Sequence, residues 1–164
     1  MELFSEEVAK SLGPSAFAAG KVDVTSEEAV RVALEKTVAK FGRIAGVISA
    51  GGVASAAKTA RRGKSAHTMT LDLFDFTVRV NLIGTFNVCK QVAQVMANQD
   101  AYNDDGERGV IINTASVAYQ DGQPGQVAYS ASKAGVVGMA LPMARDLAPA
   151  GIRVMTIAPG IFGM

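Results

Sequence analysis

The 164-residue sequence contains a single cysteine, Cys89, and a single histidine, His67. One cysteine cannot form an internal disulfide or a metal cluster of the cysteine type, so we expect no metal site. We interpret Cys89 as a small apolar residue on a helix rather than as a reactive thiol. His67 falls in a basic loop, and we interpret it as an exposed side chain rather than as a catalytic one.

Net charge and long hydrophobic runs are also lacking. The 16 Lys and Arg residues are nearly balanced by 15 Asp and Glu residues, which leaves a formal net charge of +1. Such a balance gives no electrostatic basis for nucleic acid or an anionic membrane as the main partner. No apolar run is long enough to span a bilayer, and the acidic first residues do not resemble a signal peptide or a mitochondrial presequence. We therefore expect neither a membrane span nor a targeting segment in this chain.

The pattern that is present alternates strands with helices. With 49% hydrophobic and 19% charged residues, the chain can bury the core of one domain. Helical spacing and caps predict helices over 2–12, 27–41, 70–80, 81–98 and 126–147. Short apolar runs predict strands over 16–22, 44–49, 110–113 and 152–157, the last three buried on both faces. This alternation is typical of βαβ units and a parallel sheet.

Residues suited to chemistry follow three of the predicted strands. Ser49-Ala50-Gly51-Gly52 follows one strand, Ser116 follows the next, and Pro159-Gly160 follows the last. In open parallel sheets, ligands bind outside the carboxyl ends of the strands, so we expect these three patches to lie together. The small run Ala50-Gly51-Gly52 would let a bound ribose lie close to the backbone.

Tyr129 and Lys133 stand at positions i and i+4 of the helix after Ser116, so they share one helix face. The ordinary pKa of tyrosine is about 10. A neighbouring ammonium favours the phenolate, which makes such a pair a proton donor and acceptor for a carbonyl and alcohol. Ser116 would donate a hydrogen bond to the same oxygen. Alone, the Tyr-x-x-x-Lys spacing describes many solvated helix faces and Ser116 a turn cap, but their joint order is specific.

The run NTASVAYQDGQPGQVAYSASKAGVVGMALPMARDLAPAGIRVMTIAPGIFG closely resembles the short-chain dehydrogenase/reductase family, and the resemblance extends from about Asp23 to the end. VNLIGTFNV, around Asn81, is similar to the Asn-containing helix of that family. Polar insertions at 58–67 and 103–108 match the subgroup that acts on 3-hydroxyacyl-CoA and hydroxysteroids. The resemblance implies an α/β, Rossmann-like, doubly wound parallel sheet in three αβα layers, and a single partial NAD(P)-binding domain over 1–164.

The resemblance implies a role for each matching residue. Tyr129 would be the general acid/base, Lys133 would lower its pKa and bind the nicotinamide ribose, and Ser116 would orient the substrate oxygen. Asn81 would bend its helix and hold a water in a proton relay. Asp23 and Val24 would contact the adenine, whereas residues at the strand ends would line the rest of the NAD. The full set expected to bind NAD is Asp23, Val24, Ala50, Gly51, Tyr129, Lys133, Pro159, Gly160 and Ile161.

The activity that the resemblance implies is NAD-dependent interconversion of a secondary alcohol and a ketone, with an acyl-CoA or steroid-like substrate. It also implies a mitochondrial location and a homotetramer built on the helices at 72–98 and 126–147. Small residues suited to close helix packing there are Gly84, Ala93, Ala134, Gly138 and Ala140. Arg61, Arg62 and Lys64 could meet a CoA phosphate or RNA, although we favour a solvated basic loop.

The sequence departs from the family pattern at both ends. No two of its 17 glycines stand at i and i+2, so the glycine-rich turn that cradles a pyrophosphate is missing, with the strands around it. The last strand is missing too, and Met164 stands where the subgroup has Thr. The predicted strand at 16–22 would then lack a neighbour, which is costly. Re-pairing of strands, a piece of a longer protein and a truncated gene model remain open, and we favour the last two.

The lost glycine turn also motivates a second hypothesis. In it, the chain is a catalytically degenerate or truncated family member that acts as a scaffold subunit. A flavodoxin-like domain is a third reading, but it leaves YSASK after Ser116 unexplained.

Overall fold

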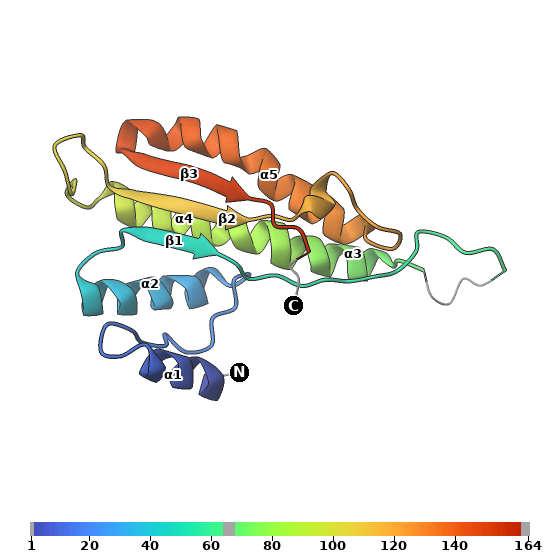
Figure 1. Cartoon of the computed structure of the whole chain (residues 1–164), viewed down its shortest axis with the longest axis horizontal. Coiled ribbons are helices and arrows are strands. Elements are labelled where there is room, and N and C mark those ends of the chain that lie inside the picture. The colour runs from blue at the N-terminus through green and yellow to red at the C-terminus, as the bar shows by residue number, and fades with distance from the viewer. Residues whose placement is uncertain (1, 64–67, 162–164) are drawn as a thin grey trace.

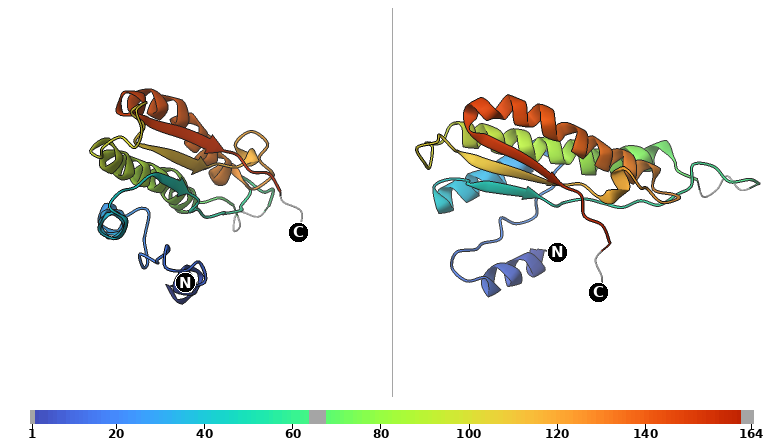
Figure 2. Two further views of the ribbon diagram at one scale, coloured as in Figure 1. Left: turned by 60° about the vertical axis from the view of Figure 1, so that its left-hand side comes forward. Right: turned by 45° about the horizontal axis from the view of Figure 1, so that its top comes forward.

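The computed structural model describes residues 2–63 and 68–161, with side chains from residue 5 onward. Within these ranges, strands β1 (Gly46–Ser49), β2 (Gly109–Thr114) and β3 (Ile152–Ile157) form a parallel sheet in the order β1-β2-β3 (Figure 1). Helices α2 (Glu27–Phe41), α4 (Gly84–Ala97) and α5 (Val127–Leu147) lie on one face of this sheet (Figure 2). The predicted incomplete α/β, Rossmann-like parallel fold is confirmed.

The helix boundaries follow from local capping. The Ser26 hydroxyl accepts a hydrogen bond from the Ala29 N–H at the start of α2, and Gly42 ends this helix with φ of 79°. That left-handed conformation suits glycine, since it lacks a Cβ. Thr70 caps α3 (Leu71–Val78) by accepting from the Leu73 N–H. The predicted helix starts and stops at these positions are therefore confirmed.

A π-helix, η1 (Arg79–Ile83), joins α3 to α4, so the two helices predicted over 70–80 and 81–98 form one continuous rod. The Gly84 N–H bonds to the Arg79 carbonyl, which stands five residues back. Such a turn is wider than an α-helical one and often occurs at functional sites. It carries Asn81, whose side chain is fully buried.

The core lies between the sheet and the helical layer. Its centre is formed by side chains from both layers that are almost wholly buried: Ile44, Cys89, Val92, Ala93, Met96, Ile111, Ile152 and Val154. Cys89 is fully buried on α4, which agrees with its interpretation as a small apolar residue, and burial raises the pKa of its thiol. Within the described ranges, no helix is both long and apolar enough to cross a membrane.

The expectation that the three strands are buried on both faces is wrong. Ile48 is 68% exposed, Met155 is 55% exposed and Ile157 is 49% exposed. The strand register places Ile48 and Met155 on the same face, on either side of Ile112. The reason is that α2, α4 and α5 all pack on the opposite face, so the described residues leave this apolar face uncovered.

The strand expected over 16–22 is also not formed, and this segment is coil. A strand needs a neighbour to accept its hydrogen bonds, and no strand in the described residues pairs with this segment. The coil packs on α2 instead, where the rings of Phe17 and Phe41 lie 5.7 Å apart and Lys36 Nζ donates to the Ala19 carbonyl at 3.0 Å. With the preceding α1 (Glu2–Ser11), it lies beyond the β1 edge (Figures 1 and 2).

Two methionines on opposite sides of the sheet test this division into a covered and an uncovered face. Met96 is fully buried, so Met96→Ala should lower the free energy of unfolding by about 2 to 5 kcal/mol through lost contacts and a cavity. Met155→Ala on the uncovered face should change it by less than about 1 kcal/mol. Urea denaturation measures both values, and equal losses would contradict the assignment of the two faces.

Candidate active site

The loops after the three strands line one cleft of about 380 Å³. Because the strands are parallel and in register, their carboxyl ends meet at one edge of the sheet. The cleft is lined by Ala50, Gly52, Val53, Ala54, Thr114, Ala115, Ser116, Tyr129, Lys133, Pro159 and Gly160. The structure thus brings together the loops and the helix that the sequence singled out.

Tyr129 and Lys133 lie one turn apart near the start of α5. Lys133 Nζ is 5.7 Å from the centroid of the Tyr129 ring. Tyr129 is half-buried, whereas Lys133 is only 6% exposed. Both line the cleft, as the i, i+4 spacing predicted. The arrangement places an amine and a phenol together beside the space where a substrate could bind.

A hydrogen bond and burial determine the environment of the Lys133 amine. Its Nζ donates a hydrogen bond to the Thr114 carbonyl at 2.7 Å, at the end of β2. Burial lowers the pKa of Lys133 below its ordinary value, because the ammonium loses contact with water. In unfolded chains a lysine titrates near about 10.4. Between the two values the unfolded state binds more protons, so Lys133 makes the free energy of unfolding rise with pH there.

Ser116 lines the cleft and also caps a turn. Its hydroxyl lines the cleft and accepts from the Ala118 N–H at 3.2 Å, which caps the short 3₁₀ helix η2 (Val117–Tyr119). The Val117 N–H donates to the Pro159 carbonyl at 3.0 Å, so the loops after β2 and β3 are tied together. Accepting this bond leaves the hydroxyl proton of Ser116 available for a second partner.

Asn81 lies behind the cleft rather than in its lining. Its Oδ1 accepts from the Val53 N–H at 2.8 Å, and its Nδ2 donates to the Val53 carbonyl at 2.9 Å and to Ser132 Oγ at 3.0 Å. The Asn81 carbonyl accepts from the Thr85 hydroxyl at 2.7 Å. The π-helix lies at the position of the expected bend, whereas the bend itself and the water of the relay stay predictions.

A second, smaller cavity of about 160 Å³ adjoins the cleft at Ala50. It is lined by Val24, Ile48, Ser49, Ala50, Gly51, Thr85 and Val88, which include three of the residues expected to bind NAD. The Val24 carbonyl is held by Asn87 Nδ2 at 2.8 Å. A Cβ on Gly84 would come within 2.6 Å of Val24, so a glycine is needed for α4 to approach Val24.

Some predicted residues are not brought into either cavity. Asp23 is exposed, and its carboxylate accepts from the N–H and the hydroxyl of Thr25, which lower the pKa of Asp23. Ile161 is fully exposed and lines neither cavity. Arg61 and Arg62 are exposed, as a solvated loop predicts. Some sequence interpretations lie outside the described residues, namely those on Lys64, His67 and Met164.

Sequence reasoning missed parts of the site. Gly52 lines the cleft, and a Cβ on it would lie 3.1 Å from Asn81 Oδ1 and 3.7 Å from Lys133 Nζ. Gly52 was named in the small run suited to a ribose but was left out of the set expected to bind NAD. Ser132 was overlooked although it stands within YSASK. Val53 carried no signal, because it takes part through its backbone groups.

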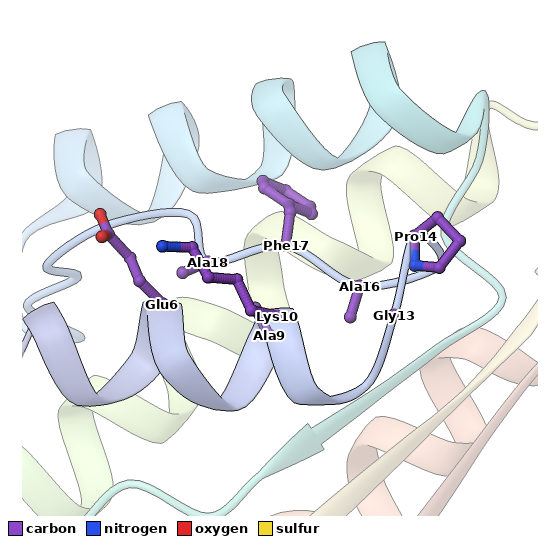
Figure 3. A pocket seen from close by; sticks show the side chains of 8 residues that line it. All are labelled: Glu6, Ala9, Lys10, Gly13, Pro14, Ala16, Phe17 and Ala18. Carbon is purple, nitrogen blue, oxygen red and sulfur yellow. The ribbon is translucent and has the colours of Figure 1, made fainter.

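Larger cavities lie elsewhere but hold none of the predicted site residues. A cavity of about 520 Å³ lies between α1 and the coil that returns along it (Figure 3). Glu6 and Lys10 project from α1 toward this coil, which carries Phe17. A groove of about 660 Å³ lies between α2 and α4. Neither lies at the carboxyl ends of the strands, where parallel α/β folds bind ligands.

The fold and the cleft define an α/β domain of Rossmann type. The chain belongs to the short chain dehydrogenase family, whose model matches residues 3–163. It is 58% identical over 160 residues to 3-hydroxyacyl-CoA dehydrogenase type-2 from Bos taurus, covering 96% of this chain and 59% of that protein. The chain therefore spans about three fifths of the length of this relative.

The solved structures that are similar to this chain include two dehydrogenases. The first is 3-hydroxyacyl-CoA dehydrogenase type-2 from Mycobacterium avium, with a TM-score of 0.88 and 39% identity over 96% of this chain and 61% of the other. The second is NAD+-bound xylitol dehydrogenase, with a TM-score of 0.74 and 34% identity over 87% of this chain and 50% of the other. The family membership expected from the sequence is thus confirmed.

The burial of Lys133 predicts a titration below that of an ordinary lysine. In an NMR titration of protein with ¹³C-labelled lysine, the Cε signal that Lys133→Met removes should have a midpoint below about 10.4. The physical cause is the desolvation of the ammonium. A midpoint at or above the ordinary value would show that the Lys133 amine is in contact with water.

Proposed function

We propose that the protein is an NAD-dependent oxidoreductase that interconverts a secondary alcohol and a ketone, with Tyr129 as the general acid/base. The observation that carries the proposal is the cleft at the carboxyl ends of the strands, where Tyr129, Lys133 and Ser116 converge. A phenol, an amine and a hydroxyl around one space suit proton transfer to and from a single oxygen. Membership of the short chain dehydrogenase family supports the same reaction class.

The residues of the two adjoining cavities fit a nicotinamide nucleotide. The smaller one has an apolar wall from Val24 and Val88 that suits an adenine, and the larger one suits the nicotinamide and its ribose. Ala50 lines both, and the absence of a side chain at Gly52 lets a sugar lie against the backbone. When bound, the nicotinamide supplies the hydride chemistry. NAD rather than NADP is proposed because the similar xylitol dehydrogenase is NAD+-bound.

The residues of the chain supply position and proton handling. The Ser116 hydroxyl keeps a proton to donate to the substrate oxygen while its oxygen caps η2. The Tyr129 hydroxyl donates the proton to that oxygen when a ketone is reduced, and accepts it when an alcohol is oxidised. Lys133, held by the Thr114 carbonyl, stabilises the phenolate and contacts the ribose. Asn81 supports the loop that carries Gly52 and Val53.

We further propose a 3-hydroxyacyl-CoA as the substrate class. The support is the printed name of the relative from Bos taurus and of the similar structure from Mycobacterium avium. A hydroxysteroid is the second class that the sequence resemblance implied. The same resemblance supports a mitochondrial location.

Replacing the Tyr129 hydroxyl tests the mechanism. Tyr129→Phe should lower the rate of NADH oxidation with acetoacetyl-CoA by about 100-fold to 10,000-fold, because the general acid is lost. Tyr102→Phe is the matched control, since Tyr102 bonds to Glu107 away from the cleft. An absorbance assay at 340 nm measures both rates, and equal rates for Tyr129→Phe and the unmodified protein would refute the assigned role.

Nucleotide binding distinguishes the scaffold hypothesis from the oxidoreductase proposal. The scaffold hypothesis was motivated by the lack of a Gly-x-Gly sequence among these 164 residues. Titration with NADH, followed by fluorescence, should give a dissociation constant in the micromolar range if the oxidoreductase proposal holds. The absence of binding at millimolar NADH would favour the scaffold.

We also propose that the protein is a homo-oligomer, and a tetramer by resemblance. Apolar side chains on α3, η1, α4 and α5 are about half exposed, namely Phe76, Ile83, Phe86 and Leu141. Gly84 and Ala93, expected at such a contact, are instead buried within the chain, whereas Ala134 and Gly138 are exposed. Exposed apolar residues on helices favour association.

Light scattering at micromolar concentration checks the oligomer. The unmodified protein should have the mass of a tetramer, and Phe86→Asp should shift it toward the monomer because a charge is costly in an apolar contact. Leu12→Asp, at a residue that is 68% exposed beside α1, should leave the mass unchanged. A monomeric mass for the unmodified protein would contradict the proposal.

A further inference from the structure

Ser132 lies between the two residues of the Tyr–Lys pair but does not face the cleft. It is fully buried, and its hydroxyl takes part in two hydrogen bonds. It donates to the Tyr129 carbonyl at 2.7 Å and accepts from Asn81 Nδ2 at 3.0 Å. A serine that bonds to a carbonyl three residues back is common in helices. The bond from Asn81 is different, because it joins two segments that are 51 residues apart.

The bond from Asn81 brings a third segment into the same network. The Asn81 side chain also pairs with both backbone groups of Val53, in the loop after β1. The π-helix, this loop and the first turn of α5 are therefore joined through one buried amide. In a buried setting each of these bonds is strong, and loss of one partner leaves an unsatisfied polar group.

The first turn of α5 depends on this network because its N-terminus has no side-chain cap. Gln126 occupies the N-cap position, and its side chain makes no capping hydrogen bond. Instead its Oε1 accepts from the Gln123 N–H, in the preceding turn. A helix start without a cap is prone to fray. In α5 the turn at risk is the one that carries Tyr129.

We propose that Ser132 is a positioning residue, which fixes Tyr129 beside Lys133 by linking the Tyr129 carbonyl to the buried amide of Asn81. The inference rests on the proposed function, since it assigns Tyr129 the proton-transfer step. Ser132 itself touches neither substrate nor cofactor. It acts on the backbone of the turn, so it governs where the Tyr129 hydroxyl stands and not whether a nucleotide binds.

The test compares Ser132→Ala with Ser130→Ala. The Ser130 hydroxyl is buried on the same turn, but it has no hydrogen-bond partner among the described residues, so it is the matched control. With NADH and acetoacetyl-CoA, Ser132→Ala should lower kcat by about 10-fold to 100-fold, because a small misplacement of a reacting group is costly. The KM for NADH should change by less than about threefold.

Three outcomes overturn the proposal. The first is a kcat for Ser132→Ala equal to that of Ser130→Ala. The second is a parallel loss of kcat and nucleotide affinity with a lower thermal midpoint, which indicates a structural role alone. The third is a full, additive loss when Ser132→Ala is combined with Asn81→Ala, because residues that act through one bond are not additive. If Ser132→Ala does not fold, Ser132→Cys replaces it in the test. Its kcat should fall at least threefold, since a thiol is a weak hydrogen-bond donor. A kcat for Ser132→Cys equal to that of the unmodified protein would then refute the proposal.

A measurement that does not depend on catalysis distinguishes this inference from the proposed function. The Cε titration midpoint of Lys133 should move toward the ordinary lysine value in Ser132→Ala and stay unchanged in Ser130→Ala, because a loosened turn admits water to the amine. A shifted midpoint in a protein that reduces no ketone would refute the proposed function and leave the positioning role intact. An unshifted midpoint in an active protein would refute the positioning role.

Discussion

The buried side-chain amide of Asn81 is the constraint around which the site is built. A polar group with no access to water must have its hydrogen bonds satisfied within the protein. Asn81 meets this requirement with Val53 and Ser132, and each bond fixes a segment that approaches the cleft. The π-helix supplies the position of this amide, so an irregularity in the backbone of the rod sets the geometry of the cleft.

The rod formed by α3, η1 and α4 also positions the second cavity, which is lined by Val24 and Val88. Asn87 binds the Val24 carbonyl, and Gln91 binds the Glu27 carbonyl at 3.0 Å, so α4 fixes the start of α2. Gly84 permits α4 to approach Val24 closely. Two neighbouring cavities, proposed to hold the two ends of a dinucleotide, therefore take their spacing from a single rigid helix.

The sequence allowed the fold class, the helix caps at Ser26 and Thr70 and the position of most cleft residues to be predicted. These features depend on local chemistry and on the rule that parallel strands end together. The expectations that failed depend on what lies beside a segment. An apolar run such as 44–49 predicts a strand, but it does not tell whether a second layer covers Ile48. The run at 16–22 was expected to be a strand, but it is coil because it has no neighbouring strand to pair with. Ser132 and Val53 were missed because their roles arise from contacts across many residues.

The central claim is that the cleft at the carboxyl ends of the strands binds a nicotinamide nucleotide beside Tyr129 and Lys133. Amide chemical shifts of ¹⁵N-labelled protein, followed during titration with NAD+, test it most directly. The account predicts saturable shifts at Val24, Gly52 and Lys133, with little change around Lys10 in the cavity beside α1. Shifts confined to that cavity, or none at millimolar NAD+, would contradict the account.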